Sequence, residues 1–325
     1  MITAPLAWLG RQGPRAIAAV VVIAIATPTL GAMLKPFVTE AIFALLCIAF
    51  LRVDSDALRG YLRRPALVLG ATMWTTLAVP LLFGVIGMSI GLDTRAPALF
   101  LALMLQAAAS PMMAAPAFAA IMGLDATLVL TTLVASTALT PLTAPLFLHL
   151  FIGPALSLSP LALGLKLSGL LAGSMILAVV IRRVAGAAAI ARYSDQVNGL
   201  NILLVFVFVA AVMENVGARF LAAPVAMLAL LATAFAIAFA LLGVTALVLA
   251  RSGRARAFAL GMMTSQRNMG LMLAAAGNVL PDATWLYFAL AQFPIYLSPL
   301  ILGEIARRWT KPSKAPDQSF GGTNM

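Results

Sequence analysis

Long apolar segments, separated by short basic clusters, fill most of the 325-residue sequence. Hydrophobic residues make up 63% of the chain and charged residues 10%, and the mean hydropathy is +1.06. A soluble domain has about 45–50% apolar and about 25% charged residues, so a water-soluble fold could not bury this much apolar surface. Because a helix needs about 20 apolar residues to cross a lipid bilayer, the length predicts an all-α polytopic membrane protein of about ten transmembrane helices.

The predicted spans are the apolar runs between charged residues, prolines and glycines. They cover residues 16–34, 38–51, 65–90, 96–123, 126–152, 159–181, 198–217, 220–250, 256–280 and 283–306. Lys and Arg gather on one side of these spans, as they do in cytoplasmic loops. Sixteen lie on that side (Arg11, Arg15, Arg52, Arg59, Arg63, Arg64, Arg182, Arg183, Arg192, Arg251, Arg254, Arg256, Arg307, Arg308, Lys311 and Lys314) and three on the other (Lys35, Arg95 and Arg219). This asymmetry predicts an even number of spans, with both termini in the cytoplasm.

The composition argues against several other functions. The net charge of +11 does not indicate nucleic-acid binding, because the basic residues lie at span ends and not on one folded face. The chain has one cysteine, Cys47, and one histidine, His149, which cannot build a cysteine or multi-histidine metal site, so we expect no metal and no cofactor. The sequence has no paired intramembrane aspartates, no His-Glu-x-x-His motif and no channel filter motif, so we expect neither an enzyme nor a channel.

Two short motifs recur at nearly the same spacing. Asp125-Ala126-Thr127 is followed 157 residues later by Asp282-Ala283-Thr284, and Thr140-Pro141-Leu142 is followed 158 residues later by Ser298-Pro299-Leu300. With five spans in each half, the two copies must have opposite orientations in the membrane, as in inverted-repeat transporters. We therefore predict a first five-helix repeat at residues 1–152, an inverted second repeat at 153–308 and a disordered cytoplasmic tail at 309–325.

The fourth and ninth spans are interrupted at equivalent positions of the two halves. In the fourth span, Pro111 and Pro116 each remove a backbone donor and disfavour a continuous helix, although two prolines alone could also produce a kinked, packed helix. In the ninth span, Gln266, Arg267 and Asn268 lie inside a hydrophobic stretch. Non-helical backbone at membrane depth is tolerated where protein buries it or where it lines a watery cavity. The two interruptions therefore predict a solute site near the bilayer midplane, as in secondary transporters.

An arginine inside a membrane span is costly, so Arg267 is a candidate functional residue. We expect its permanent positive charge to stabilise the crossed helix ends, and its fork of donors to pair with a carboxylate or sulfonate of the solute. The alternative is a buried ion pair with Glu214 of the seventh span.

The sequence around the interruptions resembles the bile acid:sodium symporter family and its bacterial relatives. Ser-Pro-Met-Met-Ala-Ala at 110–115 resembles the Cys-Pro-Gly-Gly type of interruption in that family, and Leu-Thr-Pro-Leu at 139–142 resembles the segment that follows it. Arg-Asn-Met-Gly-Leu at 267–271 resembles the Gln-Asn-Ser-Gly-Leu crossover. The resemblance spans most of the chain. It implies a panel domain and a core domain, crossing fourth and ninth helices, and alternating-access transport of a small organic anion with sodium across the inner membrane.

The resemblance also indicates site residues. Substrate-binding candidates are Ser110, Pro111, Met112, Met113, Gln266, Arg267 and Asn268, and ion-coupling candidates are Thr75, Gln106, Thr264 and Glu214. The chain departs from the family pattern where the family binds sodium. Thr75 stands in place of a glutamine, Thr264 lies in the region of a glutamate, and Arg267 stands in place of the crossover glutamine. The alternative is therefore a sodium-independent exporter, proton-coupled or facilitative, related to arsenite and auxin carriers.

Overall fold

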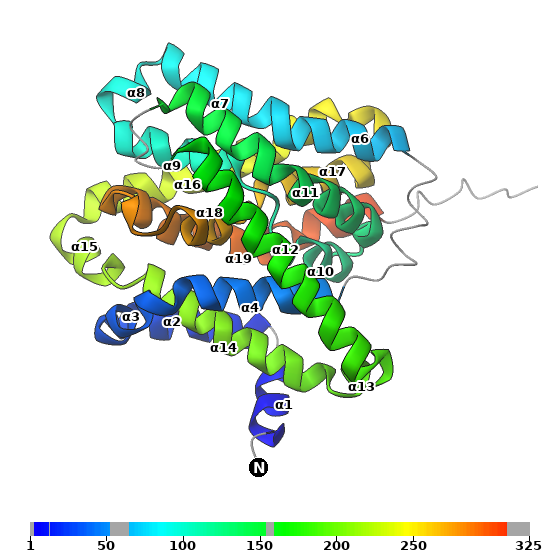
Figure 1. Ribbon diagram of the computed structural model, residues 1–325. Helices are drawn as coiled ribbons and strands as arrows, with labels where there is room; N and C mark the ends of the chain where they lie inside the picture. The colour runs from blue at the N-terminus through cyan, green and yellow to red at the C-terminus, as the bar shows by residue number, and fades with distance from the viewer. Residues whose placement is uncertain (1–2, 13, 53–64, 154–158, 311–325) are drawn as a thin grey trace, which may run out of the picture.

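The computed structural model describes residues 3–12, 14–52, 65–153 and 159–310. All regular secondary structure in these ranges is helical, apart from one isolated bridge between two extended residues (Figure 1). Within them, seven helical segments are long and apolar enough to cross a membrane: Pro28–Leu51, Pro65–Ser89, Ala126–Phe151, Pro160–Ala185, Ser194–Ala222, Pro224–Val248 and Asp282–Arg308. The chain is therefore an all-α, multi-pass membrane protein.

The fourth and ninth predicted spans consist of shorter helices. The fourth contains α9 (Pro97–Ala108) and α10 (Ala115–Ile121). The ninth contains α17 (Arg254–Ser265), α18 (Met269–Ala276) and the 3₁₀ turn η5 (Gly277–Val279). Both predicted interruptions are thus present as gaps in the helical hydrogen bonding, which explains why neither span contains one long apolar helix.

The predicted second span, 38–51, has the bounds of a helix in the structure, but the predicted break between the first two spans is misplaced. The structure has a helix before them, α1 (Thr3–Gln12), and then α2 (Pro14–Ala26), which ends early because Thr27 precedes a proline and has a non-helical conformation (φ −124°, ψ 64°). From there α3 (Pro28–Leu34), the 3₁₀ turn η1 (Lys35–Phe37) and α4 (Val38–Leu51) follow without a loop. Pro36 is tolerated because it lies in the first turn of η1, where its missing N–H costs little.

The remaining elements follow the predicted spans more closely. They are α6 (Pro65–Met73), the π turn η2 (Trp74–Ala78), α7 (Val79–Ser89), α8 (Leu92–Arg95), α11 (Ala126–Phe151), α12 (Pro160–Ala185), α13 (Ala187–Arg192), α14 (Ser194–Val212), α15 (Val216–Ala222), α16 (Pro224–Val248), the 3₁₀ turn η4 (Ala250–Ser252) and α19 (Asp282–Thr310). The predicted tail begins at 309, but α19 continues to Thr310, and residues 311–325 lie outside the described ranges.

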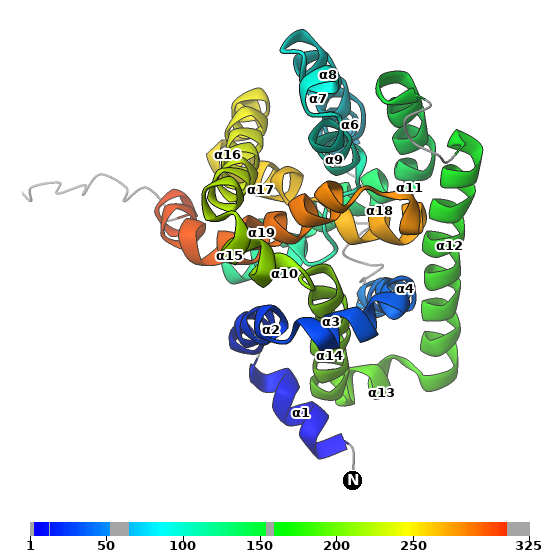
Figure 2. The ribbon, with the colours of Figure 1, turned by 90° about the vertical axis from the view of Figure 1, so that its left-hand side faces the viewer.

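The helices form two groups that meet along a shared interface. In the first group, α14 packs against α1, α2, α3 and α4, and α4 also packs against α12. The second group contains α6, α7, α9, α10, α11, α16, α17 and α19, and its tightest contact is between α16 and α17. Figure 2 shows α2, α4 and α14 on one side and α6, α7, α16 and α17 on the other. Helix α18 lies between them and contacts α4, α9 and α12.

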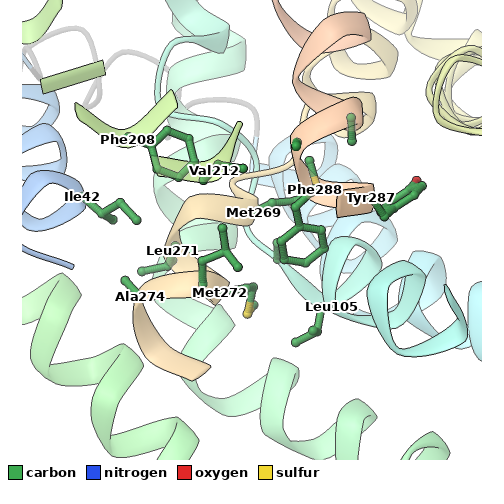
Figure 3. Close-up of a cluster of buried hydrophobic side chains, with 14 of the residues drawn as sticks. Ile42, Leu105, Phe208, Val212, Met269, Leu271, Met272, Ala274, Tyr287 and Phe288 are labelled. Atoms are coloured by element: carbon green, nitrogen blue, oxygen red, sulfur yellow. The ribbon is translucent and has the colours of Figure 1, made fainter. Parts of the chain in front are cut away.

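Small and apolar residues close the contacts within and between these groups. A Cβ atom on Gly261 of α17 would lie 2.6 Å from the carbonyl oxygen of Leu242. The backbones of α16 and α17 are therefore in direct contact here. Around α18, Figure 3 shows Ile42 of α4 and Phe208 of α14 facing Leu271, with Phe288 of α19 on the other side of Met269. Apolar side chains from both groups therefore pack around the second interruption.

Candidate solute site at two paired helix interruptions

The first interruption separates α9 from α10. Helix α9 stops at Ala108 because Ala109 is extended (φ −64°, ψ 150°) and Pro111 follows, which has no N–H to continue the ladder. Helix α17 stops at Ser265, where the extended Gln266 (φ −95°, ψ 97°) follows without a proline. The next helix, α18, begins with a side-chain cap, since the Asn268 side-chain oxygen accepts the Leu271 N–H at 3.1 Å.

The two interruptions bind each other through their backbones. Pro111 and Arg267 face each other as an isolated antiparallel pair. On either side, the Met112 N–H donates to the Gln266 carbonyl oxygen (2.7 Å) and the Asn268 N–H donates to the Ser110 carbonyl oxygen (2.8 Å). Each interruption thus supplies backbone hydrogen-bond partners that the other needs where its helical bonding stops.

Arg267 adds side-chain bonds to this crossing. The residue is 1% exposed, and its guanidinium donates from Nη1 and Nη2 to the Thr75 carbonyl oxygen (both 3.2 Å) and from Nη1 to the Ala109 carbonyl oxygen (2.9 Å). Both carbonyls belong to residues where regular helical bonding fails. Ala109 follows the end of α9, so its carbonyl has no partner one turn further on.

The Thr75 carbonyl is free of a helical partner because of Pro80. In the π turn η2 the Val79 N–H donates to the Trp74 carbonyl oxygen, one position earlier than in an α-helix. In this register the next donor in line, for the Thr75 carbonyl, would be residue 80, and proline has no N–H. The guanidinium therefore supplies donors that the third span itself lacks.

Glu214 does not pair with Arg267, so that alternative is wrong. The Glu214 carboxylate lies 3.0 Å from the Lys35 ammonium, which also stands over the Trp285 ring at 5.5 Å from its centroid. Among the described residues, Arg267 makes no ion pair. Its charge is instead balanced by carbonyl dipoles, because the C-terminal ends of α9 and α17 carry partial negative charge and both lie at the crossing.

The other predicted ion-coupling residues are buried near this crossing. The Thr75 and Thr264 hydroxyl oxygens lie 3.2 Å apart, so these two residues from different spans form one hydrogen bond. Gln106, in the last turn of α9, accepts a hydrogen bond from the Tyr287 hydroxyl group. Glu214 borders a different pocket, together with Lys35, Arg219 and Asp282. The structure thus brings three of the four candidates into the core of the second helix group and places Glu214 elsewhere.

Several buried polar groups near the crossing lack a hydrogen-bond partner among the described residues. They are the Ser110 hydroxyl, the Gln266 side-chain amide, the Arg267 Nε–H and, on α11, the hydroxyls of Thr132, Ser136 and Thr137. The sequence analysis missed the α11 hydroxyls, although their spacing along one helix face was a usable signal. No group of three His, Cys, Asp or Glu residues that could hold a metal occurs within the described ranges.

A cavity of about 410 Å³ lies beside the crossing, between the two helix groups. Four of the predicted substrate-binding residues border it: Met112, Met113, Arg267 and Asn268. Ser110, Pro111 and Gln266 do not; they are buried behind it and serve the backbone pairing. The opposite wall comes from α4 and α14, with Ile42, Leu46, Arg52, Asn201 and Phe208 among its residues. Sequence reasoning did not find this wall, because which helix faces meet is decided by tertiary packing.

Comparison of the sequence with protein-family models gave no match, and comparison with curated proteins gave none either. The geometry of the crossing and of the adjoining cavity therefore carries the functional proposal.

Proposed function

We propose that this protein is a secondary transporter that moves a small organic anion across the membrane by alternating access. One observation carries the proposal: two interrupted helices bind each other through their backbones and border a cavity between two packed helix groups. Transporters commonly place a solute at such a point, where one helix group can move against the other around a fixed site. The volume of the cavity is in the range of small-molecule sites, about 300–1,000 Å³.

The element order supports two inverted five-helix repeats with ten crossings. In the first half a helix of 12 residues (α9), an interruption and a helix of 7 residues (α10) precede α11, which has 26 residues. In the second half the corresponding lengths are 12, 8 and 29 residues for α17, α18 and α19. This parallel supports the division at residues 1–152 and 153–308. In this proposal the first helix group is the panel domain and the second is the core domain, as in the bile acid:sodium symporter family.

The distribution of basic residues supports an orientation. The cavity reaches Arg52, which follows the last residue of α4 on the arginine-rich side. We place that side in the cytoplasm, with both termini there, and the protein in the inner membrane. In this proposed orientation the cavity opens towards the cytoplasm, and the contact of Lys35 with Glu214 and Trp285 lies on the outer side, beside the second pocket.

The position of the Arg267 guanidinium supports transport without sodium. A coupling sodium ion would be bound by oxygen atoms, and the Thr75 and Ala109 carbonyl oxygens at the crossing already accept bonds from a fixed cation. This observation favours the second candidate, a proton-coupled or facilitative exporter related to arsenite and auxin carriers, over a sodium symporter. Both candidates use the same cavity.

The test is uptake of labelled organic anions into proteoliposomes that contain the wild type or one of two glycine variants. A Cβ on Gly270, which borders the cavity, would lie 3.3 Å from the Phe208 ring, so Gly270→Leu fills the cavity between α18 and α14. Gly243 of α16 has no atom within 4 Å of such a Cβ, so Gly243→Leu is the matched control. We expect uptake by the wild type and by Gly243→Leu, and none by Gly270→Leu. Equal uptake by all three proteins would refute this cavity as the transport site.

Imposed ion gradients separate the two candidates. We expect wild-type uptake to be the same with and without a sodium gradient, and a proton gradient then distinguishes proton-coupled from facilitative transport. A sodium-driven signal would reject the sodium-independent candidate and support a symporter.

A further inference from the structure

The charged residues that border the cavity are both arginines. The lining contains Arg52 and Arg267, and no Asp, Glu or Lys among the described residues. The guanidinium nitrogens of Arg267 donate to the Thr75 and Ala109 carbonyls, and neither of those residues borders the cavity. Both Nη atoms of Arg267 are therefore engaged in the core and the residue is 1% exposed, whereas Arg52 is exposed, so Arg52 is the more accessible cation for a solute in the cavity.

Arg52 lies at one end of a stripe on α4 that faces the cavity. The stripe contains Ile42, Leu45, Leu46 and Ala49 and then Arg52, a stretch of eleven residues that rises about 15 Å along a helix. The Arg52 Nη2 donates to the Asn198 side-chain oxygen at 2.7 Å, which fixes the guanidinium against the first turns of α14. An arginine side chain carries five N–H groups, and within the described ranges the other nitrogens of Arg52 have no further hydrogen-bond partner.

The two ends of the cavity differ in polarity. At the Arg52 end lies Asn201, one turn beyond Asn198 on α14. Gln292 and Tyr296 of α19 add further polar groups to the lining. Near the crossing most of the wall is apolar, with Ile42, Phe208, Met112, Met113 and Met269 in the lining beside Arg267 and Asn268. Methionine side chains adapt to irregular apolar shapes, so this end suits a variable hydrocarbon body.

We propose that Arg52 is the anion-binding residue of the cavity and that the solute is an amphipathic carboxylate or sulfonate, whose acid group binds Arg52 and whose apolar body extends towards the two interruptions. This proposal rests on the proposed function and specifies its substrate. An exposed arginine suits the role because the acid group is bound near water and the pair is not desolvated at full cost. Arginine also binds a carboxylate through two parallel donors, which fixes the orientation of the solute.

The test measures binding of matched ligands to purified protein in detergent. The ligands are aliphatic and aryl monocarboxylates and their neutral carboxamides, and the proteins are the wild type, Arg52→Gln, Arg52→Lys and Arg183→Gln. Arg183 is an exposed arginine near the end of α12 that does not border the cavity, so it matches Arg52 in charge and side of the membrane. Charged hydrogen bonds of this kind predict carboxylate binding about 10- to 100-fold weaker in Arg52→Gln, with carboxamide binding changed less than about twofold. We expect intermediate binding in Arg52→Lys, which keeps the charge but not the planar fork.

Three outcomes overturn the proposal in distinguishable ways. If Arg52→Gln binds carboxylates as the wild type does, Arg52 is not the anchor, while transport through the cavity stands. If Arg52→Gln weakens both ligand classes equally, or if Arg183→Gln has the same effect, Arg52 acts through shape or surface charge and not by recognising an acid. If no protein binds any carboxylate but the Gly270→Leu comparison still shows uptake of another solute through the cavity, the substrate class is wrong and the proposed transport function remains.

Discussion

Replacement of Arg267 by lysine or by methionine tests what the guanidinium does at the crossing. Arg267→Lys keeps the buried charge but loses the planar fork that joins Thr75 to Ala109. Since a hydrogen bond to a charged group contributes about 1.5–3 kcal/mol, loss of the bond to one of the two carbonyls should destabilise the protein by about that amount. The cost of burying a cation stays roughly constant, so it does not offset this loss.

Arg267→Met has two opposing effects on the free energy of folding. It leaves two buried carbonyl oxygens without a donor, at about 1–3 kcal/mol each, or roughly 2–6 kcal/mol together. It also removes a charge from the membrane interior, which relieves about 2.5–3.5 kcal/mol on the insertion scale. With the midpoints of these two ranges, the variant loses roughly 1 kcal/mol of folding stability. We therefore expect the charge-preserving lysine variant to be less stable than the methionine variant, although uptake is lost in both because the crossing is disturbed.

The chain carries its own reporter for this measurement. Cys47 is the single cysteine and is 5% exposed in α4, so a thiol-reactive fluorophore labels it when the protein unfolds. Melting and denaturant curves in detergent give the order of stabilities, and the same two substitutions at the exposed Arg95 serve as controls. If Arg267→Lys is as stable as the wild type, the guanidinium fork is not what satisfies the two carbonyls and the reasoning is refuted. An Arg267→Gln variant with wild-type uptake would show that transport does not need this cation.

Three further predictions concern neighbouring features. Pro80→Ala restores a backbone donor in the third span, so Arg267→Met should cost about 1–2 kcal/mol less on that background than in the wild type; additive effects in the double-mutant cycle would contradict the account of the π turn. Gly261→Leu should prevent folding, because its Cβ would meet the Leu242 carbonyl oxygen at 2.6 Å, whereas Gly243→Leu should fold normally by size-exclusion chromatography. Lys35→Met should change stability by less than about 1 kcal/mol, since the Lys35–Glu214 pair is partly exposed. In a Cys47→Ser background it should increase thiol labelling of Ala211→Cys, because Ala211 is 2% exposed and borders the pocket beside this pair.

The interrupted helices were predictable from sequence because their causes are local. A proline removes a donor wherever it stands, and polar residues in an apolar run predict a break without knowledge of the fold. Pro111, Gln266, Arg267 and Asn268 therefore marked both interruptions correctly. The Asp125 carboxylate likewise acts locally, since it caps α11 by accepting the Leu128 N–H at 3.0 Å. The break between the first two spans was misplaced because the sequence gives two prolines, Pro28 and Pro36, and nothing local says which of them ends a helix.

The partners of each group were decided by the tertiary structure alone. Hydropathy identified Arg267 as an intramembrane cation, but its pairing depends on where the third span presents a carbonyl without a helical donor, and that carbonyl is 192 residues away in sequence. Glu214 has the charge to pair with Arg267. It pairs instead with Lys35, because α14 packs against η1 and α3. The sequence by itself determined a multi-pass helical protein with two interrupted helices, since hydrophobicity and backbone donors are properties of single residues. Only packing brought those points together, set α4 and α14 opposite them and placed Arg52 on the cavity, because contacts between distant helices depend on the shape of the whole molecule.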